Sequence, residues 1–260
     1  MQTVLFHSTI FGPIHSRRLG TSLGVNLTPN DGKICSFDCL YCEAGYNAQG
    51  PGSTGMASRA EVARLLEERL RTMKENGERL DVITFSGNGE PTLHPDFEGV
   101  IDDTIALRDR YFPNVKISVL SNSTRLGNEG VRRALAKVDN NILKLDSAIA
   151  ETVRIMDRPT DPRFDIDRTI DRIAAFGSQA IVQTMLTRGT HNGRVADNTT
   201  EAEISALIDA YRRIKPGSIM LYTIDRPTPE GTLQRIPADE LRAVADRITA
   251  ETGIPVQVSA

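Results

Sequence analysis

Short apolar runs alternate with amphipathic segments along most of this 260-residue chain. Seven runs have the length of strands, the last of them short, and they cover residues 23–27, 81–85, 115–120, 142–145, 180–186, 218–224 and 254–258. Segments with helical periodicity cover residues 97–110, 129–136, 165–176, 201–214 and 237–249. Strands and helices repeated in this way are typical of an α/β fold with a parallel sheet. The periodicity predicts either a doubly wound sheet or a full or partial β/α barrel, and it does not choose between them.

A further helix is expected directly after Ser58. Ser58-Arg-Ala-Glu61 has the form of a capping box, which satisfies free amides at the start of a helix. Apolar residues at helical spacing follow as far as the stop signal Asn76-Gly77, and they are Val62, Leu65, Leu66, Leu70 and Met73. Residues 34–56 form the only long insertion without such a pattern, and loops of that length are usually functional.

No Pro/Gly/Ser linker divides the chain, so we expect one domain over residues 1–260, with a core at about 20–225 and an extension at about 226–260. The composition is 39% hydrophobic and 25% charged, with a net charge of −3. An acidic total makes a nucleic-acid partner less expected, although a local basic patch is invisible in a total. The first residues lack the pattern of a signal peptide, and no stretch has the roughly 18 apolar residues of a membrane span. A cytoplasmic protein that does not bind membranes is expected.

All three cysteines, Cys35, Cys39 and Cys42, fall within eight residues. An odd, clustered set is a poor disulfide framework, and in a reducing compartment it favours metal binding or catalysis. Thiolates select iron–sulfur clusters, zinc or copper(I). A structural zinc site wants four ligands, and the histidines at 7, 15, 94 and 191 are not at zinc-finger spacing. A cubane cluster on three cysteines would leave one iron open for catalysis. Two alternatives stay open, reduced cysteines without metal and a zinc site completed by a distant histidine.

The full Cys-x3-Cys-x2-Cys spacing, with Phe37 and Tyr41 inside it, resembles that of the radical S-adenosylmethionine (SAM) superfamily. The resemblance implies a partial (β/α)6 barrel with parallel strands inside and helices outside. It implies a [4Fe–4S] cluster whose open iron is chelated by SAM, and reductive cleavage of SAM to a 5′-deoxyadenosyl radical that acts on a substrate. Tyr41 would lie near the adenine. A low-potential electron donor of the flavodoxin or ferredoxin type would reduce the cluster.

The segment from Phe85 to Pro91, which contains Gly87, Asn88, Gly89 and Glu90, follows an expected strand and resembles the family's Gly-Gly-Glu-Pro segment. The resemblance implies that it contacts the methionine amino group of SAM. The glycines permit close backbone approach, and Glu90 can accept hydrogen bonds from an ammonium. Asn88 separates the two glycines, so a side chain enters where the family often has none. A plain strand-to-helix turn is the alternative.

Polar residues also end the next strands. Ser121 and Asn122 stand where the family's ribose-contacting residues lie, although an ordinary turn has the same composition. Lys144 and Asp146 share one face of a strand by its period of two, and charges on a buried face are costly unless paired or functional. They are candidates for holding ribose or carboxylate, with simple pairing of Lys144 near a strand end as the alternative. Gln183, in the strand expected at 180–186, is a candidate of the same kind, with a structural role as the alternative.

The segment from Phe11 to Gly24 and the later Met156-Asp-Arg-Pro159 resemble the branch of wyosine-synthase-like Fe–S oxidoreductases. Arg17 and Arg18 are candidates for binding an anion, with a solvated turn as the alternative. The chain has neither the additional cysteines nor the extra basic sequence of wyosine synthases. The substrate is therefore open between a tRNA base, a glycyl-radical enzyme to be activated, and others. A non-catalytic Fe–S or zinc module is the alternative from another class.

Overall fold

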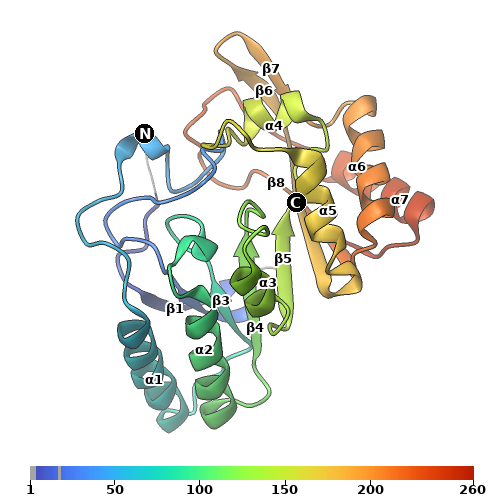
Figure 1. Cartoon of the computed structure of the whole chain (residues 1–260). Helices are drawn as coiled ribbons and strands as arrows, with labels where there is room; N and C mark the ends of the chain where they lie inside the picture. The colour runs from blue at the N-terminus through green and yellow to red at the C-terminus, as the bar shows by residue number, and fades with distance from the viewer. Residues whose placement is uncertain (1–3, 17–18) are drawn as a thin grey trace.

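The computed structural model describes residues 4–16 and 19–260, so Arg17 and Arg18 lie outside the described residues. Six parallel strands form the centre of the sheet, and their order in space follows their order in the chain. They are β2 (Gly20–Val25), β3 (Val82–Phe85), β4 (Lys116–Ser121), β5 (Asn140–Lys144), β6 (Ala180–His191) and β8 (Ser218–Thr223). This order confirms the α/β partial barrel (Figure 1).

Further strands extend this centre. β1 (Ile10–Ser16) pairs antiparallel with β2 at one edge, and β10 (Val256–Ser259) pairs parallel with β8 at the other. β7 (Arg194–Asp197) and β9 (Gln234–Arg235) pair antiparallel with the distal half of β6. The sequence patterns indicated β10 but not the other three strands.

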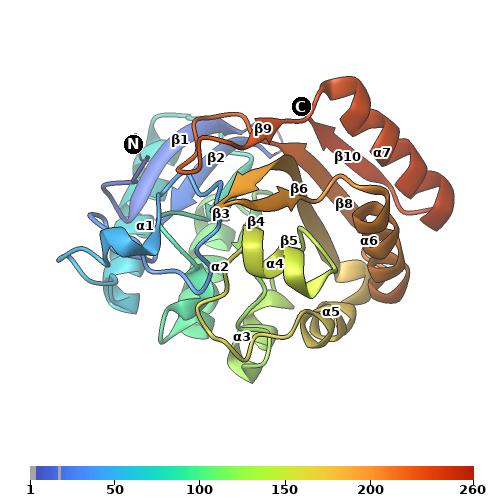
Figure 2. The ribbon, with the colours of Figure 1, turned by 90° about the horizontal axis from the view of Figure 1, so that it is seen from above.

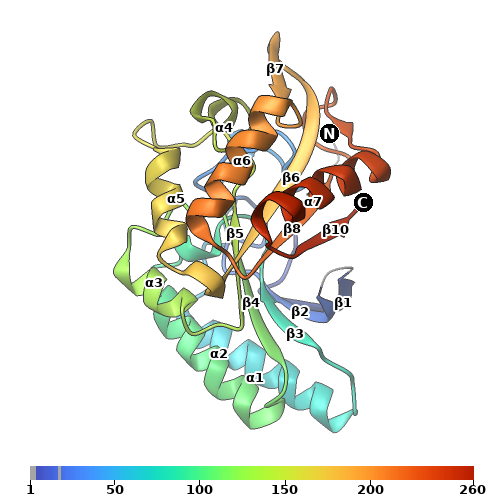
Figure 3. The ribbon, with the colours of Figure 1, turned by 90° about the vertical axis from the view of Figure 1, so that its right-hand side faces the viewer.

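Helices cover the outer face of the sheet, as the view onto the strand ends shows (Figure 2). They are α1 (Arg59–Glu75), α2 (Phe97–Tyr111), α3 (Glu129–Leu135), α4 (Ala150–Met156), α5 (Ile166–Ala174), α6 (Glu201–Ile214) and α7 (Ala238–Thr252). Ser58 caps α1 as expected, because its side chain accepts a hydrogen bond from the amide of Glu61 at 3.2 Å. The side view shows α6 and α7 over β6, β8 and β10 (Figure 3). No helix in the described part of the chain is both long and apolar enough to span a membrane.

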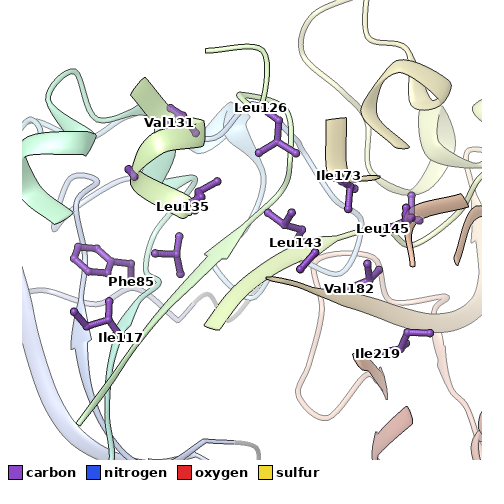
Figure 4. Packing of buried hydrophobic residues seen from close by; sticks show 14 of the residues in the cluster. Phe85, Ile117, Leu126, Val131, Leu135, Leu143, Leu145, Ile173, Val182 and Ile219 are labelled. Atoms are coloured by element: carbon purple, nitrogen blue, oxygen red, sulfur yellow. The ribbon is translucent and has the colours of Figure 1, made fainter. Parts of the chain in front are cut away.

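The main core lies between the sheet and these helices. Alternate strand residues such as Phe85, Ile117, Leu143 and Val182 belong to it and are fully buried (Figure 4). The residues between them face the inside of the barrel, and these are often polar. There the hydroxyls of Ser22 and Thr84, from neighbouring strands, lie 2.8 Å apart. The strand period of two thus separates an apolar outer layer from a partly polar interior.

Candidate functional site

A cavity of about 340 Å³ lies at the carboxyl ends of the parallel strands. Ligand sites of β/α barrels form at this end of the sheet. Most residues singled out from the sequence line it, and they are Cys35, Tyr41, Cys42, Gly87, Gly89, Glu90, Ser121, Asn122, Lys144 and Gln183. Cys39, Asn88 and Asp146 do not line this cavity. Residues that end or follow β3, β4 and β5, one residue within β6, and the cysteine loop are therefore brought together as the motifs predict.

Backbone hydrogen bonds fix the cysteine loop on two sides. On one side Ile34 forms a parallel bridge with Gly89, and the amide of Glu90 donates to the Ile34 carbonyl at 3.0 Å. On the other side the loop pairs with residues 156–160, through amide-to-carbonyl bonds from Asp38 to Asp157 (2.9 Å), Leu40 to Met156 (2.9 Å) and Thr160 to Ser36 (3.0 Å). The Met-Asp-Arg-Pro segment noted in the sequence is thus the second support of the loop.

Gly89 makes the first of these contacts possible, because a Cβ there would lie 1.8 Å from the Ile34 carbonyl oxygen. We expect Gly89→Ala to displace the cysteine loop, to lower the free energy of unfolding by about 1–3 kcal/mol and to reduce the iron bound per chain. Urea denaturation and iron analysis measure the two effects. Gly231→Ala is the matched control, because a Cβ there meets nothing within 4 Å. Full iron content in Gly89→Ala would contradict this account.

Glu90 is buried at the centre of the glycine turn. Its Oε1 accepts hydrogen bonds from the amide and hydroxyl of Thr92 at 3.0 and 2.5 Å and from the hydroxyl of Ser121 at 2.9 Å. Its Oε2 accepts from the amide of Asn122 at 2.6 Å. Burial raises the pKa of Glu90, and these donors oppose the rise. The carboxylate therefore orders the end of β4 and keeps one acceptor position of Oε2 for a ligand in the cavity.

Asn122 links this network to the cysteine loop. Its Nδ2 donates hydrogen bonds to the Ser36 hydroxyl at 3.0 Å and to the Cys35 sulfur at 3.5 Å. The hydroxyl of Ser121 points to Glu90, so within the protein it already serves as a donor. Both residues lie at the cavity, and both also have a structural part in the turn that follows β4.

Lys144 ends β5 and is paired, as the structural alternative from the sequence expected. Its Nζ lies 2.7 Å from a carboxylate oxygen of Asp157, and it also contacts Asp146 and the hydroxyl of Tyr41. Burial lowers the pKa of Lys144, but the carboxylates of Asp146 and Asp157 outweigh it and raise the pKa well above its usual value. Burial raises the pKa of Asp157 to about 6, against the opposing charge of Lys144. These buried groups form one charge cluster under the cavity.

Asn88 and Gln183 have different surroundings. The Asn88 side chain is fully buried and does not line the cavity. Its Oδ1 accepts a hydrogen bond from the amide of Phe6, and its Nδ2 donates to the carbonyls of Phe6 and Pro29, each at 2.8 Å. It therefore fastens the amino-terminal segment to the turn. Gln183 lines the main cavity and also an adjoining one of about 270 Å³, which reaches His15 on β1.

Lys33 was not singled out from the sequence, although its place two residues before the first cysteine was a readable signal. Its side chain is 1% exposed, and Nζ donates to the Gly45 carbonyl at 2.7 Å and lies 3.6 Å from an oxygen of Asp38. Burial lowers the pKa of Lys33, but the three cysteines and Asp38 outweigh it and raise the pKa above its usual value. The loop thus encloses one ammonium close to all three thiols.

The rim of the cavity carries charges that the motifs did not indicate. Glu43, just after the last cysteine, pairs with Arg226 at 2.6 Å, and Asp225 stands beside it in the lining. Arg226 follows β8 and lies 183 residues from Glu43 in sequence. Only the barrel topology brings these two segments together.

The family assignment rests on the sequence model of the Radical SAM superfamily, which matches residues 30–199. The chain belongs to the radical SAM superfamily. The matched stretch includes the cysteine loop, the glycine turn and strands β3 to β6. Members of this superfamily use a [4Fe–4S] cluster and SAM, so the family implies both cofactors for this radical SAM chain.

Curated relatives include a UPF0026 protein of Methanocaldococcus jannaschii, which is 31% identical over 225 residues, covering 85% of this chain and 64% of the relative. Another is a protein named GTPase Obg of Brachyspira hyodysenteriae, 26% identical over 253 residues, covering 96% of this chain and 35% of the relative. The chain therefore spans between about a third and two thirds of the length of these two relatives.

Solved structures share the fold. The radical SAM methyltransferase from Sphaerobacter thermophilus superposes with a TM-score of 0.66 at 16% identity, covering 92% of this chain and 65% of the other. The structure of TYW1 with a lysine-pyruvate adduct bound gives a TM-score of 0.58 at 13% identity, covering 90% and 75%. At these identities the similarity shows the fold and no more.

The residues present fit an iron–sulfur cluster. Three thiols on one loop form the soft donor set of an iron–sulfur centre, and the enclosed Lys33 offsets their negative charge. Within residues 4–16 and 19–260, no three His, Cys, Asp or Glu side chains are grouped closely enough to hold one metal ion.

Proposed function

We propose that the chain cleaves SAM reductively at a [4Fe–4S] cluster held by Cys35, Cys39 and Cys42, and that the resulting radical acts on a substrate in the barrel. The observation that carries this proposal is the position of the cysteine loop, two of whose thiols line the cavity together with Glu90. The chemistry supplied with the cluster is one-electron cleavage of the SAM sulfonium, which yields a 5′-deoxyadenosyl radical.

The chain's own residues bind and orient SAM in this proposal. Glu90 accepts from the methionine ammonium through Oε2, while the turn formed by Gly87 and Gly89 lets the ligand approach the backbone. Asn122 and Ser121 stand at the ribose position and Tyr41 at the adenine position. Lys144 and Asp146 hold this end of the barrel rigid as members of the buried charge cluster. Gln183 then faces the space left for substrate.

Several finer statements belong to the same proposal. The segment Met156-Asp-Arg-Pro159, which supports the cysteine loop, is similar to the Asn/Asp-Arg-Pro segment of the wyosine-synthase-like Fe–S oxidoreductases, and this similarity favours that branch. We expect one domain over residues 1–260. A cytoplasmic, reducing location suits a chain with three free thiols. A low-potential flavodoxin or ferredoxin would supply the electron. A tRNA base and a glycyl-radical enzyme remain candidate substrates. An affinity for tRNA that increases as the salt concentration is lowered would favour the first.

Anaerobic reconstitution with iron and sulfide tests the proposal. We expect about four irons per chain, SAM binding that changes the spectrum of the reduced cluster, and 5′-deoxyadenosine when SAM and a strong reductant are added. Iron that binds without any cleavage of SAM would favour the non-catalytic Fe–S module. Zinc in place of iron, with no SAM binding, would favour the zinc module.

Glu90→Gln tests the position assigned to the methionine end of SAM. The amide has nearly the shape of the carboxylate but no charge, and one of its two groups cannot accept a hydrogen bond. Loss of a charge-assisted hydrogen bond is worth about 1.5–3 kcal/mol, so the Kd of SAM should rise by about tenfold or more. Calorimetric titration of the reconstituted protein measures it. Glu75→Gln, at an exposed position on α1 outside the cavity, is the control and should bind SAM as the wild type does.

A further inference from the structure

A second cleft, of about 450 Å³, opens beside the cysteine loop. Its walls are formed by Ser36 of the loop, the turn after β4, residues 159–165 and one face of α5. Four arginines line it, namely Arg125, Arg163, Arg168 and Arg172. We call it the arginine cleft. It shares no lining residue with the main cavity, so the two are separate openings.

The arginine cleft is positively charged, because its lining holds four arginines and only two aspartates. Arg163 pairs with Asp161 at 2.9 Å, but in the described part of the chain Arg125, Arg168 and Arg172 have no ion-pair partner. The other acidic residue of the lining, Asp165, caps α5 by accepting from the amide of Arg168 at 3.0 Å. Three unpaired guanidinium groups in one cleft create a positive potential on a chain whose net charge is −3.

The arginine cleft is also the neighbour of a cluster ligand. The hydroxyls of Ser36 and Thr124, both in its lining, lie 2.6 Å apart. Asn122 donates to Ser36 at 3.0 Å and to the Cys35 sulfur at 3.5 Å. Two hydrogen bonds therefore connect the wall of the cleft to the first cysteine. A redox partner seated here would stand close to the cluster without entering the SAM cavity.

We propose that the arginine cleft is the docking site of an acidic, flavodoxin-like electron donor, an inference that rests on the proposed function. Complementary charge speeds encounter and fixes the orientation of such a partner. One electron passes from the reduced flavin to the oxidised cluster, and no bond forms or breaks. RNA fits the position less well, because a base must enter the main cavity, and the rim of that cavity offers no excess of positive charge: Glu43 and Arg226 pair with each other, and Asp225 adds a carboxylate.

The test combines Arg125→Glu with Arg168→Glu in the reconstituted protein. At low ionic strength we expect reduction of the cluster by reduced flavodoxin, followed in a stopped-flow instrument, to slow by about tenfold or more. The wild-type rate should fall with added salt, and the variant should have lost most of this dependence. Dithionite is small and does not need a docking surface, so its rate should be unchanged. Arg242→Glu, an exposed arginine on α7 without an ion-pair partner among the described residues, should behave as the wild type.

Binding of oxidised flavodoxin to the metal-free protein gives a readout that does not depend on the cluster. We expect the double variant to bind at least about tenfold more weakly than the wild type and Arg242→Glu. Failure of the wild type to assemble a cluster would overturn the proposed function, while this binding measurement would still decide the docking site. Equal flavodoxin binding and equal flavodoxin-driven rates in the double variant would overturn the docking proposal. So would a loss of tRNA binding at unchanged electron transfer, which would assign the cleft to RNA.

Discussion

Replacement of Lys144 by methionine should lower the free energy of unfolding by about 3–5 kcal/mol. The Lys144 ammonium lies between two carboxylates at the cavity floor; its side chain is 14% exposed, and Asp146 and Asp157 are each 2% exposed. Methionine has a similar length but no charge, so it leaves two buried carboxylates facing each other without a counter-charge. Removal of one partner from a buried ion pair is far more harmful than loss of a surface pair. Urea denaturation of the metal-free protein measures the difference.

Two further variants decide whether charge is the cause. Lys137→Met removes a surface lysine that pairs with Asp102 at 2.7 Å, and it should cost no more than about 1 kcal/mol. Adding Asp157→Asn to Lys144→Met removes one of the stranded carboxylates, so the double variant should regain part of the lost stability. A double variant that is less stable than Lys144→Met would mean that packing, and not charge, holds this cluster together.

Much of the fold follows from patterns that act locally. The helix expected at 201–214 is α6 with the same bounds, and the capping box at Ser58 opens α1. Such elements combine a cap with a long apolar stripe, so a single segment specifies them. β1 and β7 have no such signal, because both are edge strands with few buried residues, and β1 contains Gly12 and Pro13. The sequence patterns also did not indicate α4, because it has only seven residues and is stabilised by its contacts with the cysteine loop.

The candidate site divides in the same way. Cys35, Cys39 and Cys42 were readable because their spacing is local, and Lys144 and Asp146 because a strand has a period of two. Asp157 could not be found as the second partner of Lys144, since it reaches the cluster through the turn after α4 and not through a strand. Asn88 shows the opposite error, because its place between two glycines suggested a contact with ligand. Its side chain instead bonds the amino-terminal segment, which no local pattern indicated.

Loss of any one cysteine should abolish the cluster while leaving the chain folded. We expect Cys35→Ala, Cys39→Ala and Cys42→Ala each to lose most of the iron on reconstitution and to form no more 5′-deoxyadenosine than protein without iron. A cubane needs all its thiolate ligands, and no other cysteine in the sequence can replace one. Because the cluster either assembles on all three thiolates or does not assemble, the loss of activity should be larger than that caused by any other single change in the site.

The stability of the same variants should change little, which separates ligand loss from unfolding. The Cys35 and Cys42 side chains are partly exposed, so in the metal-free protein each alanine variant should lie within about 1 kcal/mol of the wild type. Cys39 is buried, so Cys39→Ala should cost about 1 kcal/mol more than the other two variants through lost core packing. Burial also raises the pKa of the Cys39 thiol well above its usual value. Its conversion to a thiolate needs the metal to displace the proton, and assembly of the cluster should therefore become slower as the pH is lowered. If Cys39→Ala retained iron and SAM cleavage while Cys35→Ala and Cys42→Ala lost both, Cys39 would be a core residue and the three-thiolate site would be wrong.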